Sequence, residues 1–126
     1  RIVAMSEFEW EALKIGAGPA PIRVDEGWLL IYHGVAGSIT GSGLEPQKHV
    51  RYAAGAMILD ADDPSRVIAR TPEPILSPET DHERGGTVAN VVFPTAIEQI
   101  GDEIFVFYGM ADSRIGVARL TRVASA

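Results

Sequence analysis

Lys14 and His33 are the residues whose types and spacing first suggest a shared chemical role. Lysine supplies a positive charge, and histidine donates hydrogen bonds when protonated, so the pair could hold an anion. A lysine before a glycine-rich loop is more often solvated, and a histidine at a strand end is often structural. Whether the two act together depends on the elements that position them.

The residues between Lys14 and His33 predict a loop followed by a β-hairpin. Glycines and prolines from position 16 to position 21 break any helix and lead the chain into a short strand near Pro21–Val24. Residues 25–27, Asp-Glu-Gly, predict a tight turn, and the apolar run Trp28–Tyr32 predicts a buried inner strand that ends at His33. Lys14 and His33 are therefore expected to point to the same place from two neighbouring strand ends.

The rest of the chain predicts further strands. Arg51–Asp60 and Val67–Arg70 are β-prone runs, and residues 71–87, which contain three prolines, predict a long loop. Period-two patterning around a turn at Gly101 predicts a hairpin between Val91–Glu98 and Ile104–Tyr108. We therefore expect an all-β chain with antiparallel hairpins.

The first thirteen residues support two interpretations. Ile2–Met5 could form a strand followed by a loop. A short helix over Ser6–Leu13, with Ser6 as N-cap and Glu9 three residues later, is the alternative. We favour strand and loop.

Composition limits the classes of partner. The chain has 126 residues, 46% hydrophobic and 22% charged, which suits one globular core. A net charge of −6 argues against nucleic-acid partners, which need a basic surface. No apolar run approaches the roughly 20 residues of a membrane helix, so no membrane partner is expected. The absence of cysteine excludes disulfides and thiolate metal sites and fits a cytoplasmic location.

The acidic run at residues 60–64, Asp-Ala-Asp-Asp-Pro, invites a calcium interpretation. It lacks the glycine and the distal glutamate of an EF-hand loop, and acidic turns before proline are far commoner. We therefore expect a turn there, and no metal or other cofactor.

Two parts of the sequence repeat one another. Ile22–Gly34 matches Ile97–Met110, and Gly55–Leu59 matches Gly116–Leu120. A unit of strand, turn, aromatic strand and glycine-led strand suits the blades of a β-propeller, which bury their faces against neighbouring blades. A small β-sandwich would show the same alternation, so the pattern alone leaves both folds open.

Five blocks between Lys14 and about Leu120 carry a family resemblance. They read KIGAGPAPI, GWLLIYHGV, YAAGAMILDADDPSRVIAR, NVVFP and IFVFYGMADSRIGVARL. In this order they resemble the C-terminal part of glycoside hydrolase family 130, the β-mannoside phosphorylases and related mannosidases. The resemblance implies part of a five-bladed β-propeller, with blade-like units at about 14–70 and 88–122 and a connecting loop at about 71–87.

The resemblance also implies an activity and its reactants. A glycoside phosphorylase, an enzyme of glycosyltransferase type, would transfer mannose from a β-mannoside oligosaccharide to inorganic phosphate as co-substrate. A β-mannosidase-type hydrolase is one alternative. A non-catalytic glycan-binding or assembly module is another.

Candidate site residues follow from the same resemblance. Those that match phosphate-binding positions are Lys14, His33 and Tyr52, and those that match positions around mannose and its acceptor are Asp112, Glu83 and Phe93. Their ordinary alternatives are core aromatic rings, a turn-capping aspartate and a solvated glutamate. The sequence departs from the family pattern at Ala89, where proline is usual, and at His82, where tyrosine is expected. These departures weaken the acceptor-side assignment.

Nothing in the chain matches the family's catalytic acid, an aspartate of the early blades. Alone, the chain is therefore expected to bind phosphate weakly and to turn over no mannoside. Two blades would also leave outer faces bare, which predicts a homo-oligomer that buries Val92 or Ile115 between chains.

Overall fold

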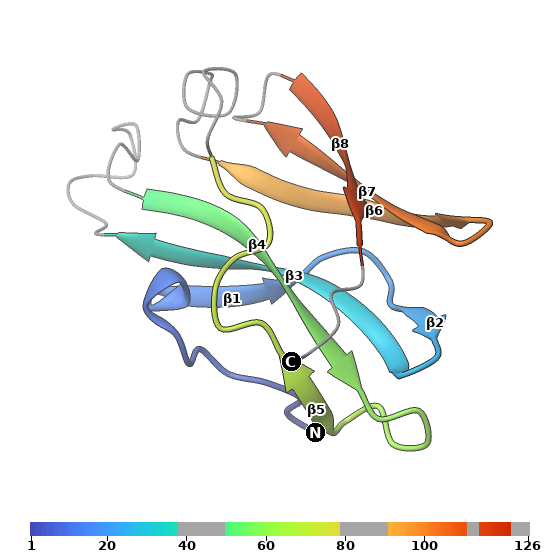
Figure 1. Cartoon of the computed structure of the whole chain (residues 1–126). Coiled ribbons are helices and arrows are strands. Elements are labelled where there is room, and N and C mark those ends of the chain that lie inside the picture. Colours follow the sequence, from blue (N-terminus) through green and yellow to red (C-terminus); the bar gives the residue numbers. More distant parts are fainter. Residues whose placement is uncertain (38–49, 79–90, 111–113, 122–126) are drawn as a thin grey trace.

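The computed structural model describes residues 1–37, 50–78, 91–110 and 114–121, which form two antiparallel β-sheets and a short 3₁₀ turn (Figure 1). The elements are η1 (Glu9–Glu11), β1 (Lys14–Ala17), β2 (Ile22–Val24), β3 (Gly27–Gly37), β4 (Val50–Leu59), β5 (Val67–Arg70), β6 (Val92–Ile100), β7 (Glu103–Met110) and β8 (Arg114–Leu120). Sheet A has the order β1-β3-β4-β5, with β2 also paired to β3, and sheet B has the order β6-β7-β8. The all-β, antiparallel expectation is confirmed.

Both hairpins predicted from the sequence are present. Gly27, with φ 148°, begins β3 directly after the β2–β3 turn, and Gly101, with φ 62°, lies in the β6–β7 turn. Glycine adopts these positive φ values at little cost, which is why the turns form there. The pairings Ile22–Leu29 and Ile97–Val106 show the resulting registers.

The predicted repeat reappears as one structural unit in each sheet. Tyr32 pairs with Gly55 in sheet A, and Tyr108 pairs with Gly116 in sheet B. A Cβ built on Gly55 would lie 2.9 Å from Tyr32 Cε1, and one on Gly116 would lie 2.7 Å from Tyr108 Cζ. In both sheets the glycine therefore makes room for the tyrosine ring of the neighbouring strand.

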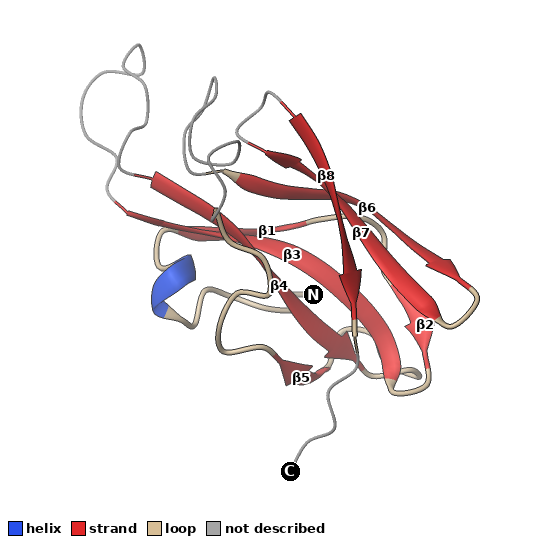
Figure 2. Ribbon diagram, turned by 45° about the horizontal axis from the view of Figure 1, so that its top comes forward, coloured by secondary structure: helices blue, strands red, loops and turns tan. Residues whose placement is uncertain are grey.

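The two sheets pack face to face (Figures 1 and 2). Ile31 and Ala54 of sheet A meet Ile97 and Val106 of sheet B, and none of these side chains is more than 8% exposed. Full burial of an aliphatic side chain of this size contributes roughly 1.5–3 kcal/mol. The side chains buried between the sheets therefore form one of the two main apolar clusters of the described residues.

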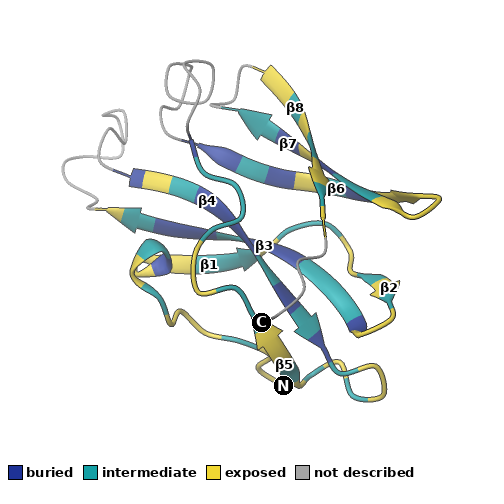
Figure 3. Cartoon of the chain, viewed as in Figure 1, coloured by how far each residue is buried: buried dark blue, intermediate teal, exposed yellow. Residues whose placement is uncertain are grey.

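The N-terminal segment covers the other face of sheet A. Tyr32, Met57 and Leu59 form the second apolar cluster there, and Trp10 packs against it. The face of sheet B that turns away from sheet A has no such cover among the described residues, since Ile115 is 81% exposed and β8 is largely exposed in Figure 3. Within the described part of the chain, sheet A is thus covered on both faces and sheet B on one.

Burial corrects one residue of the assembly prediction. Val92 is fully buried within the chain, so it is not available to an interface between chains, whereas Ile115 is exposed. The sequence pattern alone does not show which apolar residues of β6 are covered within the chain. Its strand, β6, packs closely on β3 and β4.

Three local predictions are wrong. Ile2–Met5 forms no strand, and the segment that follows contains a 3₁₀ turn with Phe8, not Ser6, as its N-cap. Lys14–Ala17 is a strand rather than a loop, because Gly16 leaves room for the His33 ring of β3 and the strands can pair closely. His33 consequently lies inside the long strand β3 instead of at its end.

Candidate functional site

Three of the predicted site residues lie on the same face of sheet A. Gly16 pairs with His33, and Val35 pairs with both Lys14 and Tyr52. Directly paired residues and residues two apart along a strand share a face. Lys14, His33 and Tyr52 are therefore neighbours on the face that turns toward sheet B.

Phe93 joins this group from sheet B. A bridge between Tyr52 and Val91 brings the start of β6 next to the start of β4. The centroid of the Phe93 ring lies 4.5 Å from that of His33 and 6.3 Å from that of Tyr52. The sequence assigned Phe93 to the sugar and the other residues to phosphate, and the structure places all four side chains, hereafter the Lys14–His33 cluster, together.

The electrostatics of the Lys14–His33 cluster favour a neutral imidazole. The pKa of His33 is lowered by burial and, second, by the positive charge of Lys14. Lys14 Nζ lies 5.8 Å from the centroid of the Tyr52 ring, within cation–π range. His33 Nδ1 is buried and makes no hydrogen bond within the described part of the chain. The cluster thus holds one fixed positive charge and an imidazole nitrogen with unused hydrogen-bonding capacity.

Gly16 fixes where the His33 ring lies. A Cβ at position 16 would stand 2.5 Å from His33 Cε1 and 2.6 Å from Nε2, closer than real Cβ atoms approach other atoms. The ring occupies the space that any other residue would fill. The glycine-rich stretch after Lys14 is therefore part of the site's geometry, a role that its loop-like composition did not suggest.

The cluster offers binding groups rather than an acid–base pair. It provides an ammonium group, an imidazole, a phenolic hydroxyl and an aromatic face, which suit an anion and an adjoining sugar ring. Within the described residues, the ion pairs are made by arginines and not by Lys14. Glycoside cleavage also needs a proton donor, and the four side chains of the cluster include no carboxylic acid.

Two predicted site residues cannot be placed. Asp112 and Glu83 lie outside the described residues, as do Ala89 and His82, where the sequence departs from the family pattern. Met110, the last residue of β7, pairs with Val92, the neighbour of Phe93. β7 therefore ends at the end of sheet B where Phe93 lies.

Sequence reasoning missed a buried ionic group behind the cluster. The Glu11 carboxylate is fully buried and accepts hydrogen bonds from Tyr32 Oη at 2.8 Å and from Arg70 Nη2 at 2.6 Å. Burial raises the pKa of Glu11, but these donors and the backbone N–H groups of Phe8 and Glu7 outweigh it and lower the pKa overall. Burial and the neighbouring Glu11 raise the pKa of Tyr32 to about 12, although Arg70 opposes the shift.

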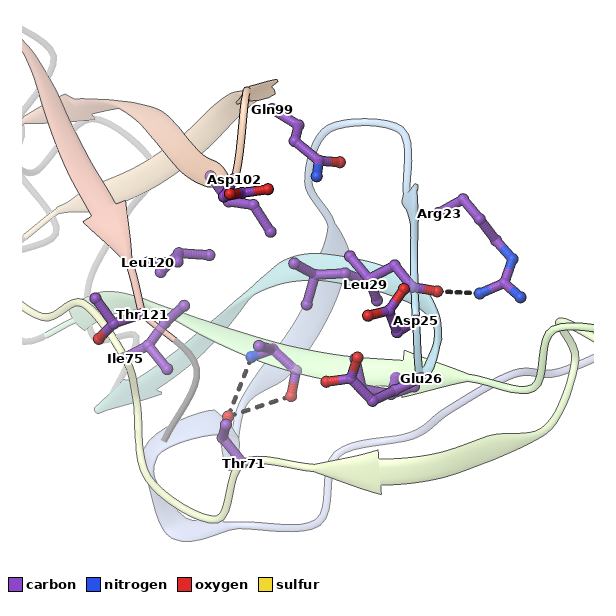
Figure 4. A pocket seen from close by; sticks show the side chains of 14 residues that line it. Arg23, Asp25, Glu26, Leu29, Thr71, Ile75, Gln99, Asp102, Leu120 and Thr121 are labelled. Atoms are coloured by element: carbon purple, nitrogen blue, oxygen red, sulfur yellow. Dashed lines mark hydrogen bonds between the residues drawn. The ribbon is translucent and has the colours of Figure 1, made fainter. Parts of the chain in front are cut away.

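An open cavity of about 770 Å³ lies between the sheets at their other end (Figure 4). Its polar lining includes Asp25, Glu26 and Asp102 from the two hairpin turns, and its apolar lining includes Leu29. Leu29 precedes His33 by four residues on β3, on the order of 13 Å at the usual rise per residue. Arg23, at the rim, donates to the carbonyl oxygens of Val24 and Gly27. A cavity with this acidic rim is unsuited to an anion.

The acidic run after β4 forms a turn, as predicted. Asp60 Oδ1 accepts the backbone N–H groups of Asp62 at 2.9 Å and Asp63 at 3.0 Å. Within the described ranges, no cluster of three or more potential metal-ligating side chains is present. Over the same ranges, no helix has the length and apolar character needed to cross a membrane.

Comparison with known proteins gives the family. Residues 1–124 match the family model described as beta-1,4-mannooligosaccharide phosphorylase. The chain belongs to glycoside hydrolase family 130. It is 47% identical to a beta-1,2-mannobiose phosphorylase of Thermoanaerobacter over 109 residues, which are 86% of this chain and 32% of that relative. It therefore spans about a third of the length of the curated relatives that it matches.

Solved structures agree on the fold. The beta-1,2-mannobiose phosphorylase from Listeria innocua, in complex with beta-1,2-mannobiose, superposes with a TM-score of 0.77 at 34% identity, over 94% of this chain and 31% of that one. A structure from a study of family 130 hydrolases that target beta-1,2 mannosidic linkages in Candida mannan gives a TM-score of 0.71 at 30% identity, over 90% and 32% of the two chains. The likeness decides between sandwich and propeller: sheets A and B are part of the five-bladed family 130 propeller.

Proposed function

We propose that this chain is part of a β-mannoside phosphorylase and carries part of its phosphate site. Lys14, His33 and Tyr52 hold inorganic phosphate, and Phe93, Asp112 and Glu83 contribute to the mannoside side. The observation that carries the proposal is the convergence of Lys14, His33 and Tyr52 on one face of sheet A, with the His33 Nδ1 atom buried and without a partner among the described residues. The named phosphorylases among the relatives support the same class of reaction.

The cluster suits the nucleophile of a phosphorolysis. A phosphate oxygen attacks the anomeric carbon of mannose, the glycosidic C–O bond breaks, and mannose 1-phosphate forms. The leaving sugar oxygen takes its proton from the catalytic acid, and no residue of this chain matches the family's acid. Charge-assisted hydrogen bonds and fixed orientation are what the site must supply to the phosphate. Lys14 provides the charge, while His33 and Tyr52 provide directional donors.

Lys14→Ala in the whole protein tests the proposal. The variant is expected to lose most phosphorolysis of a β-mannoside, with a smaller effect on binding of the mannose unit, because Lys14 contacts the phosphate. Release of mannose 1-phosphate, measured with and without phosphate, is the assay. Lys48→Ala, at a lysine to which no role is assigned, is the control. Unchanged phosphorolysis in Lys14→Ala would contradict the proposal.

A hydrolase is the second candidate, because a structure from a study of family 130 hydrolases is among the similar folds. A hydrolase uses water as the nucleophile and has no need of a cationic phosphate pocket. The same assay separates the two candidates. Equal turnover without phosphate, with free mannose as product, would assign the protein to the hydrolases.

A further inference from the structure

We propose that Glu11 is a positioning residue: its buried carboxylate fixes the turn that leads into β1 and thereby holds Lys14 in the cluster. Glu11 does not contact the anion or the reacting atoms. It acts through the backbone that joins it to Lys14, three residues later. The part of this proposal that concerns phosphate rests on the function proposed above.

The carboxylate of Glu11 is held by four donors from three parts of the chain. Oε1 accepts the backbone N–H groups of Glu7 at 2.7 Å and Phe8 at 3.0 Å, together with Arg70 Nη2 at 2.6 Å. Oε2 accepts the Tyr32 hydroxyl at 2.8 Å. Tyr32 belongs to β3 and Arg70 to β5, so the carboxylate ties the turn to two separate strands of sheet A.

Trp10 anchors the same turn beside Glu11. Its ring centroid lies 5.6 Å from that of Tyr32, and its Nε1 donates to the carbonyl oxygen of Pro72 at 2.9 Å. A Cβ at Gly34 would lie 2.6 Å from the Trp10 ring, and one at Gly55 would lie 2.5 Å from it. The indole therefore fills space that two glycines leave open, and the turn has one defined position on the sheet.

Short backbone links carry this position to Lys14. Ala12 N–H donates to Glu9 O at 3.2 Å and closes the turn. Leu13 N–H donates to Val35 O at 2.9 Å, and the next residue, Lys14, pairs with Val35 as the first residue of β1. No freely rotating linker separates the anchored carboxylate from the lysine.

β1 is a short edge strand, and Ile15 is its residue that packs against the Tyr32 cluster. It is a four-residue strand at the edge of sheet A and pairs with β3 alone. Edge strands of this length have few contacts of their own, and the glycine at position 16 adds none. The docked turn therefore adds a restraint at the end of β1 where Lys14 lies.

The anchor and the cluster lie back to back across sheet A. Tyr32 and His33 are consecutive on β3, so their side chains point to opposite faces. Tyr32 meets Glu11 on one face, and His33 lies near Lys14 and Phe93 on the other. This arrangement explains how a residue outside the cluster can set its geometry.

A double-mutant comparison in the whole protein separates positioning from general stability. Glu11→Gln is expected to raise KM for inorganic phosphate roughly tenfold, with kcat and KM for the mannoside changed by less than about twofold. In a Lys14→Ala background the same substitution should leave KM for phosphate unchanged, because the lysine that it displaces is gone. Glu9→Gln, at an exposed glutamate of the same turn, is the matched control and should change nothing.

Titration of the His33 imidazole by NMR gives a readout that needs no phosphate. The Lys14 charge contributes to the lowered pKa of His33. Lys14→Ala should therefore raise the His33 pKa, and Glu11→Gln, which displaces Lys14, should raise it too. If Glu11→Gln fails to fold, Tyr32→Phe, which removes one donor and no charge, should give the same changes at smaller size. A normal KM for phosphate in Lys14→Ala would refute the proposed function but leave the NMR test of positioning intact.

The proposal is overturned if a folded Glu11→Gln or Tyr32→Phe protein leaves both the His33 titration and KM for phosphate unchanged. It is equally overturned if Glu11→Gln raises KM for phosphate as much in the Lys14→Ala background as alone. That second outcome would mean that Glu11 affects the site through overall stability and not through Lys14.

Discussion

Sheets A and B share one unit but differ in what covers it. In the common register, Ile31 of sheet A corresponds to Phe107 of sheet B, and Ala54 corresponds to Ile115. Ile31 and Ala54 are fully buried, whereas Phe107 is 36% exposed and Ile115 is 81% exposed. The same face is thus an interface in sheet A and an open surface in sheet B.

The difference extends to polar groups. Sheet A carries a buried ion pair on one face and the Lys14–His33 cluster on the other. In the described part of sheet B an ion pair joins Arg119 to Glu103, and both side chains are more than half exposed. A repeated β-unit therefore acquires a site where neighbouring segments cover both of its faces, and the predictions below test that contrast.

The largest expected effect separates the two ion pairs. Arg70→Ala leaves Glu11 buried without its cation, which should lower the free energy of unfolding by about 3–5 kcal/mol. Arg119→Ala removes an exposed pair and should cost about 0–1 kcal/mol. Urea denaturation of the two variants makes the comparison. Equal losses would show that the contrast in burial has no energetic consequence.

A smaller contrast is expected at the paired glycines. A Cβ at Gly55 meets both Trp10 and Tyr32, whereas one at Gly116 meets Tyr108. Gly55→Val should therefore cost about 3 kcal/mol and Gly116→Val about 1 kcal/mol, within the range for overpacked cores. Thermal unfolding followed by circular dichroism measures both. A larger loss at Gly116 would contradict the account of how sheet A is covered.

The open face of sheet B should cause self-association of this chain. Exposed apolar surface of this kind favours association, so Ile115→Ser should raise the dissociation constant of the assembly roughly tenfold. Ile68→Ser, at a half-exposed residue of β5, is the control. Sedimentation analysis at micromolar concentration is the measurement, and a wild-type monomer would refute the prediction.

The smallest expected effect is a gradual loss of unfolding free energy in acid, caused by Glu11 and His33 of sheet A and its cover. The pKa of Glu11 is lowered in the folded chain, so its contribution to stability is present above its unfolded value of about 4.5 and is lost as the pH falls through the lowered value. The pKa of His33 is also lowered, so the unfolded state takes up its proton first as the pH falls below about 6.5. Glu11→Gln should flatten the lower part of the curve of unfolding free energy against pH. An unchanged curve would argue against an ionised, buried Glu11.

The parts of the fold that the sequence predicted depend on local signals. Glycines at the two hairpin turns and the Tyr32–Gly55 and Tyr108–Gly116 spacing produced the hairpins and the repeat. The Glu11–Arg70 pair joins residues 59 apart in sequence, and no local pattern indicates such a contact. Strong turn chemistry is readable from sequence, whereas a buried charge can be paired only when the tertiary structure is known.

The candidate site, too, could be predicted only where it depends on local signals. The sequence placed Lys14 and His33 near one another through the predicted strands, although it ended the second strand too early. It could not bring Phe93 to them, because that contact depends on the bridge between Tyr52 and Val91 across the two sheets. The assignment to phosphate came from the family resemblance and stays a prediction.

A phosphate titration of this chain, followed through the His33 imidazole resonances, tests the central claim most directly. We predict a saturable shift with a dissociation constant in the millimolar range or weaker, since few charge-assisted contacts are present. The shift should vanish in Lys14→Ala and persist in Lys48→Ala. Unperturbed His33 resonances at saturating phosphate, or an undiminished shift in Lys14→Ala, would contradict a phosphate site at the Lys14–His33 cluster.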